Sequence, residues 1–186
     1  MGLSLLERLT HLCYLAAMPV GSMLTVHTAR AMALLYAAGL ALMLGGRWRE
    51  GRVVWTLGCV MLWVHVAAAF HFVHGWSHVH ALEQTADQTA AMAGVRSGAG
   101  VYLNYLVMLV WAADVAFWRL AGSERYRRRS LAITASLHGF LLFMMFNAAV
   151  VFVRGGTRYV GVAIAVLLVV LAVKRLRVAR DAVIVG

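Results

Sequence analysis

The sequence predicts an all-α, polytopic integral membrane bundle of five transmembrane helices with an N-terminal interfacial amphipathic helix. Of its 186 residues, 63% are hydrophobic and only 13% are charged, which is about half the charged fraction of a soluble domain. Several apolar runs approach the roughly 20 residues that cross a hydrocarbon core. One proline and 17 glycines exclude a collagen-like or proline-linker chain. These observations place the whole chain, residues 1–186, in a single transmembrane domain.

Each predicted span is an apolar run closed by charge or glycine. The first begins at Pro19, which suits a first helical turn, and ends before Gly45 and Gly46. Ahead of it, residues 3–17 alternate apolar and charged side chains at helical spacing in a segment too short to span, which predicts the interfacial helix. The five spans are residues 19–44, 53–75, 100–120, 131–153 and 159–173.

Clusters of basic residues predict the orientation, because cytoplasmic loops retain Lys and Arg. They occur at residues 47–52, 125–129 and 174–180, which the five spans put on one side. The N-terminus is therefore expected outside and the C-terminus in the cytoplasm. A histidine-rich segment after the second span falls on the outer side. Arg154 and Arg158, in the turn between spans four and five, argue mildly the other way.

The net charge of +10 does not indicate nucleic-acid binding, because the arginines lie in short clusters between apolar runs, where membrane topology explains them. Cys13 and Cys59 lie within apolar stretches without a CxxC spacing, which is typical of buried thiols. No nucleophile motif or phosphate-binding loop is present, so the sequence names no reaction and leaves enzymatic activity open. The expected partners are the lipid bilayer and other membrane subunits or a redox partner.

Five of the eight histidines lie between residues 65 and 80. On a continuous helix His71, His74 and His78 would share one face at spacings i, i+3 and i+7. Such a stripe can bind zinc, copper or iron, or supply axial ligands to haem b, with His27 on the first span as a facing partner. The alternative is a structural polar network, since imidazole is tolerated at a membrane interface. The pattern does not distinguish metal from haem.

The same segment holds a second set of candidate metal ligands. His80, Glu83 and Asp87 repeat the i, i+3, i+7 spacing on a different face, where a solvated helix surface is the ordinary alternative. Whether these residues continue the second helix depends on Gly75, at which the helix either runs on past the membrane or bends.

An intramembrane carboxylate marks the cytoplasmic half. Asp114 in the third span is costly in lipid and is by default a functional hypothesis that needs a partner. His138 in the fourth span is the predicted partner and Arg119 is the alternative. Asp114 and His138 are therefore candidates for a proton or ion relay, against a structural ion pair.

Several polar and aromatic residues are expected to have supporting roles. Tyr102, Asn104 and Tyr105 share the depth of the histidines and are candidates to orient them or to join helices by hydrogen bonds. Four tryptophans fall near span ends, where tryptophan anchors a helix at the interface: Trp48, Trp55, Trp76 and Trp118. The ten methionines show no MxxxM or MxM cluster, which argues against a methionine-based copper(I) pathway.

The leading functional prediction is a metal- or haem-binding membrane protein for electron transfer or metal handling. Two alternatives remain open. One is a noncatalytic subunit that packs against a larger membrane complex. The other is a small transporter or proton channel that uses Asp114 and His138.

Overall fold

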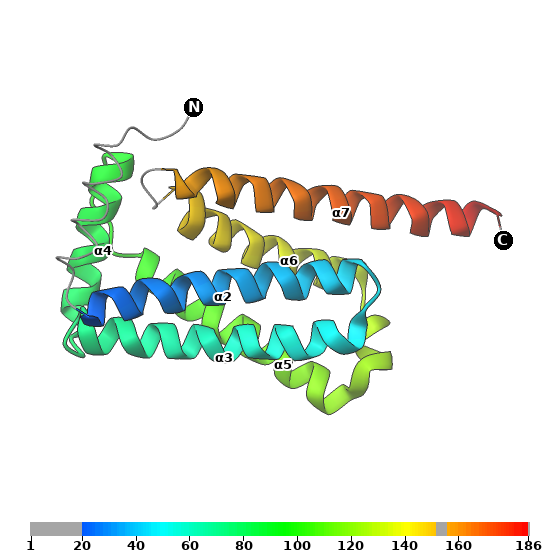
Figure 1. The fold of residues 1–186 in the computed structure, drawn as a ribbon, viewed down its shortest axis with the longest axis horizontal. Helices are drawn as coiled ribbons and strands as arrows, with labels where there is room; N and C mark the ends of the chain where they lie inside the picture. The colour runs from blue at the N-terminus through cyan, green and yellow to red at the C-terminus, as the bar shows by residue number, and fades with distance from the viewer. Residues whose placement is uncertain (1–19, 152–155, 186) are drawn as a thin grey trace.

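The computed structural model describes residues 20–151 and 156–185. Over these ranges the chain is helical without strands, which confirms the all-α prediction (Figure 1). The predicted interfacial helix at residues 3–17 lies outside the described residues. The elements are α2 (Val20–Leu44), α3 (Trp48–Phe72), α4 (His78–Ala93), α5 (Gly100–Arg127), α6 (Leu131–Phe146), the π-helical turn η1 (Asn147–Val151) and α7 (Thr157–Val185).

Among residues 20–151 and 156–185, four helices are long and apolar enough to cross a membrane: α2, α3, α5, and α6 continued by η1. This supports a multi-pass membrane protein. The fifth predicted span, residues 159–173, is not confirmed. It lies in α7, where Arg158 and Lys174 bound an apolar run shorter than a typical span.

The helical hairpin α2–α3 forms the centre of the bundle, and α5, α6 and α7 pack around it (Figure 1). Its turn needs a positive φ of 80° at Gly46, a conformation that glycine adopts without strain. Gly58 on α3 allows a close approach of the α5 side chain Trp111, because a Cβ there would stand 2.8 Å from the Trp111 ring. Helices α3 and α5 therefore pack with the Trp111 ring directly against the Gly58 backbone.

The second span ends in a bend. Helix α3 stops at Phe72, and Gly75 and Trp76 then take positive φ angles of 57° and 60°. Ser77 caps the next helix, its hydroxyl accepting a hydrogen bond from the His80 backbone N–H at 3.1 Å. Helix α4 consequently turns across the end of the bundle (Figure 1). Of the two courses left open by the sequence, the bend at Gly75 is confirmed and the continuous helix is wrong.

Tryptophans form much of the core. Trp55 and Trp111 have no exposed surface and Trp118 is 1% exposed. The prediction that Trp55 and Trp118 anchor the interface is wrong, because both indole N–H groups find acceptors inside the protein. Trp55 donates to Asp114 at 2.8 Å and Trp118 to Ser123 at 3.2 Å.

Candidate functional site

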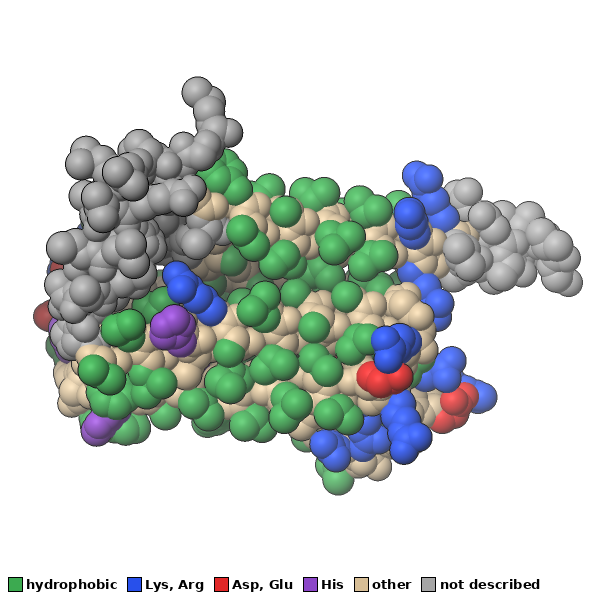
Figure 2. Space-filling model, in the orientation of Figure 1, with side chains coloured by type: hydrophobic (Ala, Val, Ile, Leu, Met, Phe, Trp, Pro, Cys, Tyr) green, Lys and Arg blue, Asp and Glu red, His purple; other side chains and the backbone are tan. Residues whose placement is uncertain are grey.

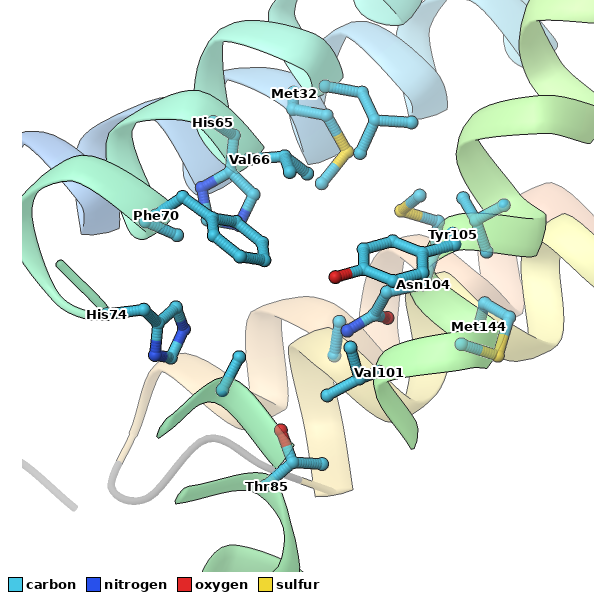
Figure 3. A pocket seen from close by; sticks show the side chains of 16 residues that line it. Met32, His65, Val66, Phe70, His74, Thr85, Val101, Asn104, Tyr105 and Met144 are labelled. Atoms are coloured by element: carbon cyan, nitrogen blue, oxygen red, sulfur yellow. The ribbon is translucent and has the colours of Figure 1, made fainter. Parts of the chain in front are cut away.

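A cavity of about 210 Å³ lies near the end of the bundle at which α4 crosses (Figure 3). We call it the α4-end pocket. Side chains from α2, α3, α4, α5 and α6 line it, together with the bend after α3 and Ala148 of the π-helical turn. π-Helical turns occur frequently at functional sites. The polar or polarisable members used below are Met32, His65, His74, Asn104, Tyr105 and Met145.

His65 projects from α3 into this pocket in one defined tautomer. Its Nδ1 lies 3.1 Å from the Thr25 carbonyl oxygen and 3.4 Å from the Thr28 hydroxyl of α2. A carbonyl can only accept, so in the neutral ring Nδ1 carries the proton. The lone pair is then on Nε2, which has no hydrogen-bond partner among the described residues.

His74 lies in the bend at the rim of the pocket. Its Nδ1 is buried without a hydrogen-bond partner in the part of the chain that the structure describes. The ring packs edge-on against Phe70 at 5.5 Å and stands 5.6 Å from the ring of His80. Burial, followed by the neighbouring His80, lowers the pKa of His74 below its usual 6.5. The neutral imidazole is therefore the stable form of His74 near neutral pH.

The bend separates the other two histidines of the predicted stripe from the pocket. His71 is exposed, and its Nδ1 accepts a hydrogen bond from Trp76 Nε1 at 3.3 Å. His78 is also exposed and pairs with the Tyr105 hydroxyl at 3.0 Å. The single-face geometry expected for His71, His74 and His78 therefore does not hold. It assumed 100° per residue through a segment that is not helical.

The remaining predicted ligands do not line the pocket with His65 and His74. His27 is exposed on α2 and does not line the pocket. Three of them lie exposed on α4: His80, Glu83 and Asp87. Asp87 forms an ion pair with Arg96, with Arg96 Nε 2.9 Å from Asp87 Oδ1. Within residues 20–151 and 156–185, no group of three or more His, Cys, Asp or Glu side chains is arranged to hold a metal ion.

Of the predicted supporting residues, Asn104 and Tyr105 line the pocket, and Tyr105 orients His78 through its hydroxyl group. Tyr102 is exposed, with its ring 5.8 Å from that of His78. These tyrosines therefore contact His78, which lies outside the pocket, instead of His65 and His74, which line it.

A buried ion-pair network occupies the opposite half of the bundle. The Asp114 carboxylate accepts hydrogen bonds from the Arg129 guanidinium, from Trp55 Nε1 at 2.8 Å and from the Tyr126 hydroxyl at 2.9 Å. Arg129 also donates to Tyr126 at 3.1 Å and to the Thr134 hydroxyl at 3.0 Å. Every charged atom of the pair therefore has a partner, as buried charges require.

The prediction that Asp114 pairs directly with His138 is wrong, because Arg129 lies between them and contacts both. Its Nη2 stands 3.3 Å from His138 Nε2. The alternative partner, Arg119, is exposed. The sequence indicates Arg129 only as part of a basic cluster that orients the chain in the membrane. Its pairing with Asp114 is not evident there, because no helical spacing relates the two residues.

A break in α5 brings the missed residues to the carboxylate. Gly122 has φ 80° and ψ 163°, so the segment after it folds back. Tyr126 then stacks on Trp118 with ring centroids 3.9 Å apart, which directs its hydroxyl to Asp114. The glycine was the available sequence signal for this reversal.

An aromatic layer separates the two sites. The rings of Trp55 and Trp111 lie 4.8 Å apart, and Tyr36 meets Trp111 edge-on at 5.6 Å. Tyr36 follows the pocket residue Met32 by one turn of α2, whereas Trp55 donates to Asp114 on the other side. The layer therefore closes the pocket toward the ion-pair network.

Comparison of the chain with protein-family models, with curated proteins and with solved structures finds no match.

Proposed function

We propose that the protein binds a transition-metal ion in the α4-end pocket, for metal handling or electron transfer. One observation carries the proposal: two imidazoles of the pocket, His65 and His74, each keep a ring nitrogen without a protein partner among the described residues. Buried polar atoms are normally hydrogen-bonded. His74 Nδ1 is such a buried atom, and His65 Nε2 is a second unpaired imidazole nitrogen at the same cavity, so together they favour a ligand there.

The surroundings of His65 support ligation. Metal-binding histidines almost always donate their other ring N–H to a carbonyl, carboxylate or water, which fixes the tautomer and raises the basicity of the ligating nitrogen. The Thr25 carbonyl makes this contact with His65 Nδ1. His65 is thus already oriented as a ligand through Nε2, and His74 lines the same pocket.

The size of the cavity favours an ion over a macrocycle. About 210 Å³ is smaller than the roughly 300–1,000 Å³ of pockets that hold drug-sized ligands. A metal ion with water needs much less space than haem b. The metal alternative of the sequence analysis is therefore the one we carry forward.

We further propose the topology predicted from the basic residues, with the α4 end outside. Figure 2 shows most of the Lys and Arg side chains of one face gathered at the opposite end of the bundle. Arg175 of α7 reaches the α2–α3 turn there, because its guanidinium would stand 3.9 Å from a Cβ at Gly46. Residues 159–173 then form a fifth crossing, with the N-terminus outside and the C-terminus in the cytoplasm. A C-terminal reporter that is active only in the cytoplasm tests this orientation.

The relay and subunit hypotheses stay predictions. The aromatic layer and the fully paired Asp114 carboxylate favour a structural role for the ion-pair network. Proton flux into proteoliposomes tests the relay, which requires a difference between wild type and Asp114→Asn.

Titration of metal-depleted, full-length protein in detergent with Zn(II), Fe(II) and Cu(I) tests the proposed function. We expect saturable binding of at least one of these ions, and we expect His65→Gln to weaken it by about tenfold or more. His71→Ala is the matched control, because it removes an exposed imidazole from the same helix. Absence of saturable binding, or equal affinity in His65→Gln and wild type, would overturn the proposal.

A further inference from the structure

We infer that the ion is copper(I), bound by His65 Nε2 and by the thioethers of Met32 and Met145. This inference rests on the proposed function and specifies its ligand. It concerns side chains from three different helices, which line the same 210 Å³ pocket.

Three helices place these side chains on the wall of one cavity. Met32 follows Thr28 by one turn of α2, and the Thr28 hydroxyl lies 3.4 Å from His65 Nδ1. Met145 of α6 lines both this pocket and a smaller cavity of about 60 Å³ beside Tyr36, one turn beyond Met32. Both methionines are buried, at 6% and 8% exposure. Figure 3 shows Met32 and His65 on the same side of the pocket.

The donor atoms fit copper(I). Thioether sulfur is a soft ligand that selects Cu(I), and imidazole binds copper as well. The absence of a methionine motif along the chain does not count against this set, because the two thioethers come from helices that are distant in sequence. The fold places Met32 and Met145 at one pocket, which no spacing along the sequence indicates.

The charge of the pocket favours a monovalent ion. Its lining contains no carboxylate, no thiol and no lysine or arginine, so every ligand that it offers is neutral. The desolvation cost of an ion grows with the square of its charge, so a divalent ion loses about four times as much as a monovalent one in this low-dielectric interior. Zn(II) and Fe(II) would lack the anionic ligand that offsets this cost, whereas Cu(I) needs none.

Competition with the chromogenic chelator bicinchoninate, under anaerobic reducing conditions, tests the inference on the full chain in detergent. Zn(II) is titrated in parallel. The variants Met32→Leu and Met145→Leu remove one thioether each with little change in volume. Met43→Leu is the matched control, since Met43 is buried at the other end of α2 outside the pocket.

Wild type and Met43→Leu should bind Cu(I) with equal affinity, and each pocket variant should bind at least about tenfold more weakly. Saturable Zn(II) binding without Cu(I) binding would overturn the copper assignment and leave the proposed function standing. Failure to bind any of these ions would overturn both. Cu(I) affinity that is unchanged in the pocket variants would also overturn the thioether assignment.

X-ray absorption of the copper-loaded wild type gives a second measurement that does not depend on a variant folding. The inference expects sulfur scatterers beside nitrogen at the copper. A first coordination shell of nitrogen and oxygen alone would contradict it.

Discussion

The two polar regions of this bundle differ in the pairing of their central groups: the charged atoms of Asp114 and Arg129 all have partners, although the neighbouring His138 Nδ1 is buried without one. In the ion-pair network, Asp114 has three donors and each guanidinium nitrogen of Arg129 has an acceptor. In the α4-end pocket, His65 and His74 each keep a nitrogen that no described residue occupies. Polar groups that are fully hydrogen-bonded in an apolar interior stabilise a fold. An unpaired buried polar group is costly, and a bound ligand that pairs with it removes this cost. The comparison therefore contrasts a charge pair that the protein satisfies with a cavity at which we propose that an ion is bound.

The largest expected effect concerns the network. Asp114→Asn leaves the Arg129 charge buried and uncompensated, so the free energy of unfolding should fall by about 3–5 kcal/mol. Thermal or denaturant unfolding in detergent measures this loss. The control is Glu124→Gln at the exposed Glu124–Arg128 pair, for which we expect a change of no more than about 1 kcal/mol. Equal stability of Asp114→Asn and wild type would contradict the structural role of the Asp114–Arg129 ion pair.

A smaller effect is expected where the aromatic layer meets the network. Trp55→Phe removes the indole N–H that donates to Asp114, at a cost of about 1.5–3 kcal/mol for a hydrogen bond to a charged group. Trp63→Phe is a matched control, because Trp63 is on the same helix and 48% exposed. If both variants lose equal stability, the hydrogen bond to Asp114 does not hold the layer in place.

The bend that positions His74 should show an effect near 1 kcal/mol. Gly75→Ala meets no neighbour, but φ at this position is 57°, a strained value for an L-residue costing about 1–2 kcal/mol. Gly139, helical and equally unobstructed, is the opposite case, and Gly139→Ala should stabilise by up to about 1 kcal/mol. Unfolding free energies that move in the same direction in both variants would contradict the described bend.

The smallest effect is a pH dependence of the metal-free protein. Because the folded-state pKa of His74 is lowered, the unfolded chain binds more protons as the pH falls below about 6.5. Stability should therefore decrease as the pH drops from 6.5 toward the folded-state pKa, and His74→Ala should show a shallower decrease. Unfolding curves recorded between pH 8 and pH 5 measure the slope. An identical slope in both proteins would mean that His74 is not desolvated.

Sequence reasoning succeeded where local pattern decides the structure. Apolar runs bounded by charge identify α2, α3, α5 and α6, and Gly75 marks the bend, whereas the polar helix α4 follows no such run. It failed where distance along the chain separates partners. Asp114 meets Arg129 only because Gly122 reverses the chain, and Met32 and Met145 line one pocket only because the fold brings α2 near α6. No periodicity within a single helix encodes such contacts.

The histidine stripe failed for a different reason. Its geometry extended one helical period through Gly75 and Trp76, where the backbone leaves the helical region. Of the predicted ligands His71, His74 and His78, only His74 remains at the pocket. His65, which the spacing left outside that stripe, lies in the pocket because the break does not affect α3.

An anomalous-scattering map of metal-loaded protein tests the central claim most directly, because it locates the ion. The account predicts a peak in the α4-end pocket at about 2.0–2.1 Å from His65 Nε2. A peak on the exposed α4 face formed by His80, Glu83 and Asp87, or a map with no peak at the pocket, would contradict it.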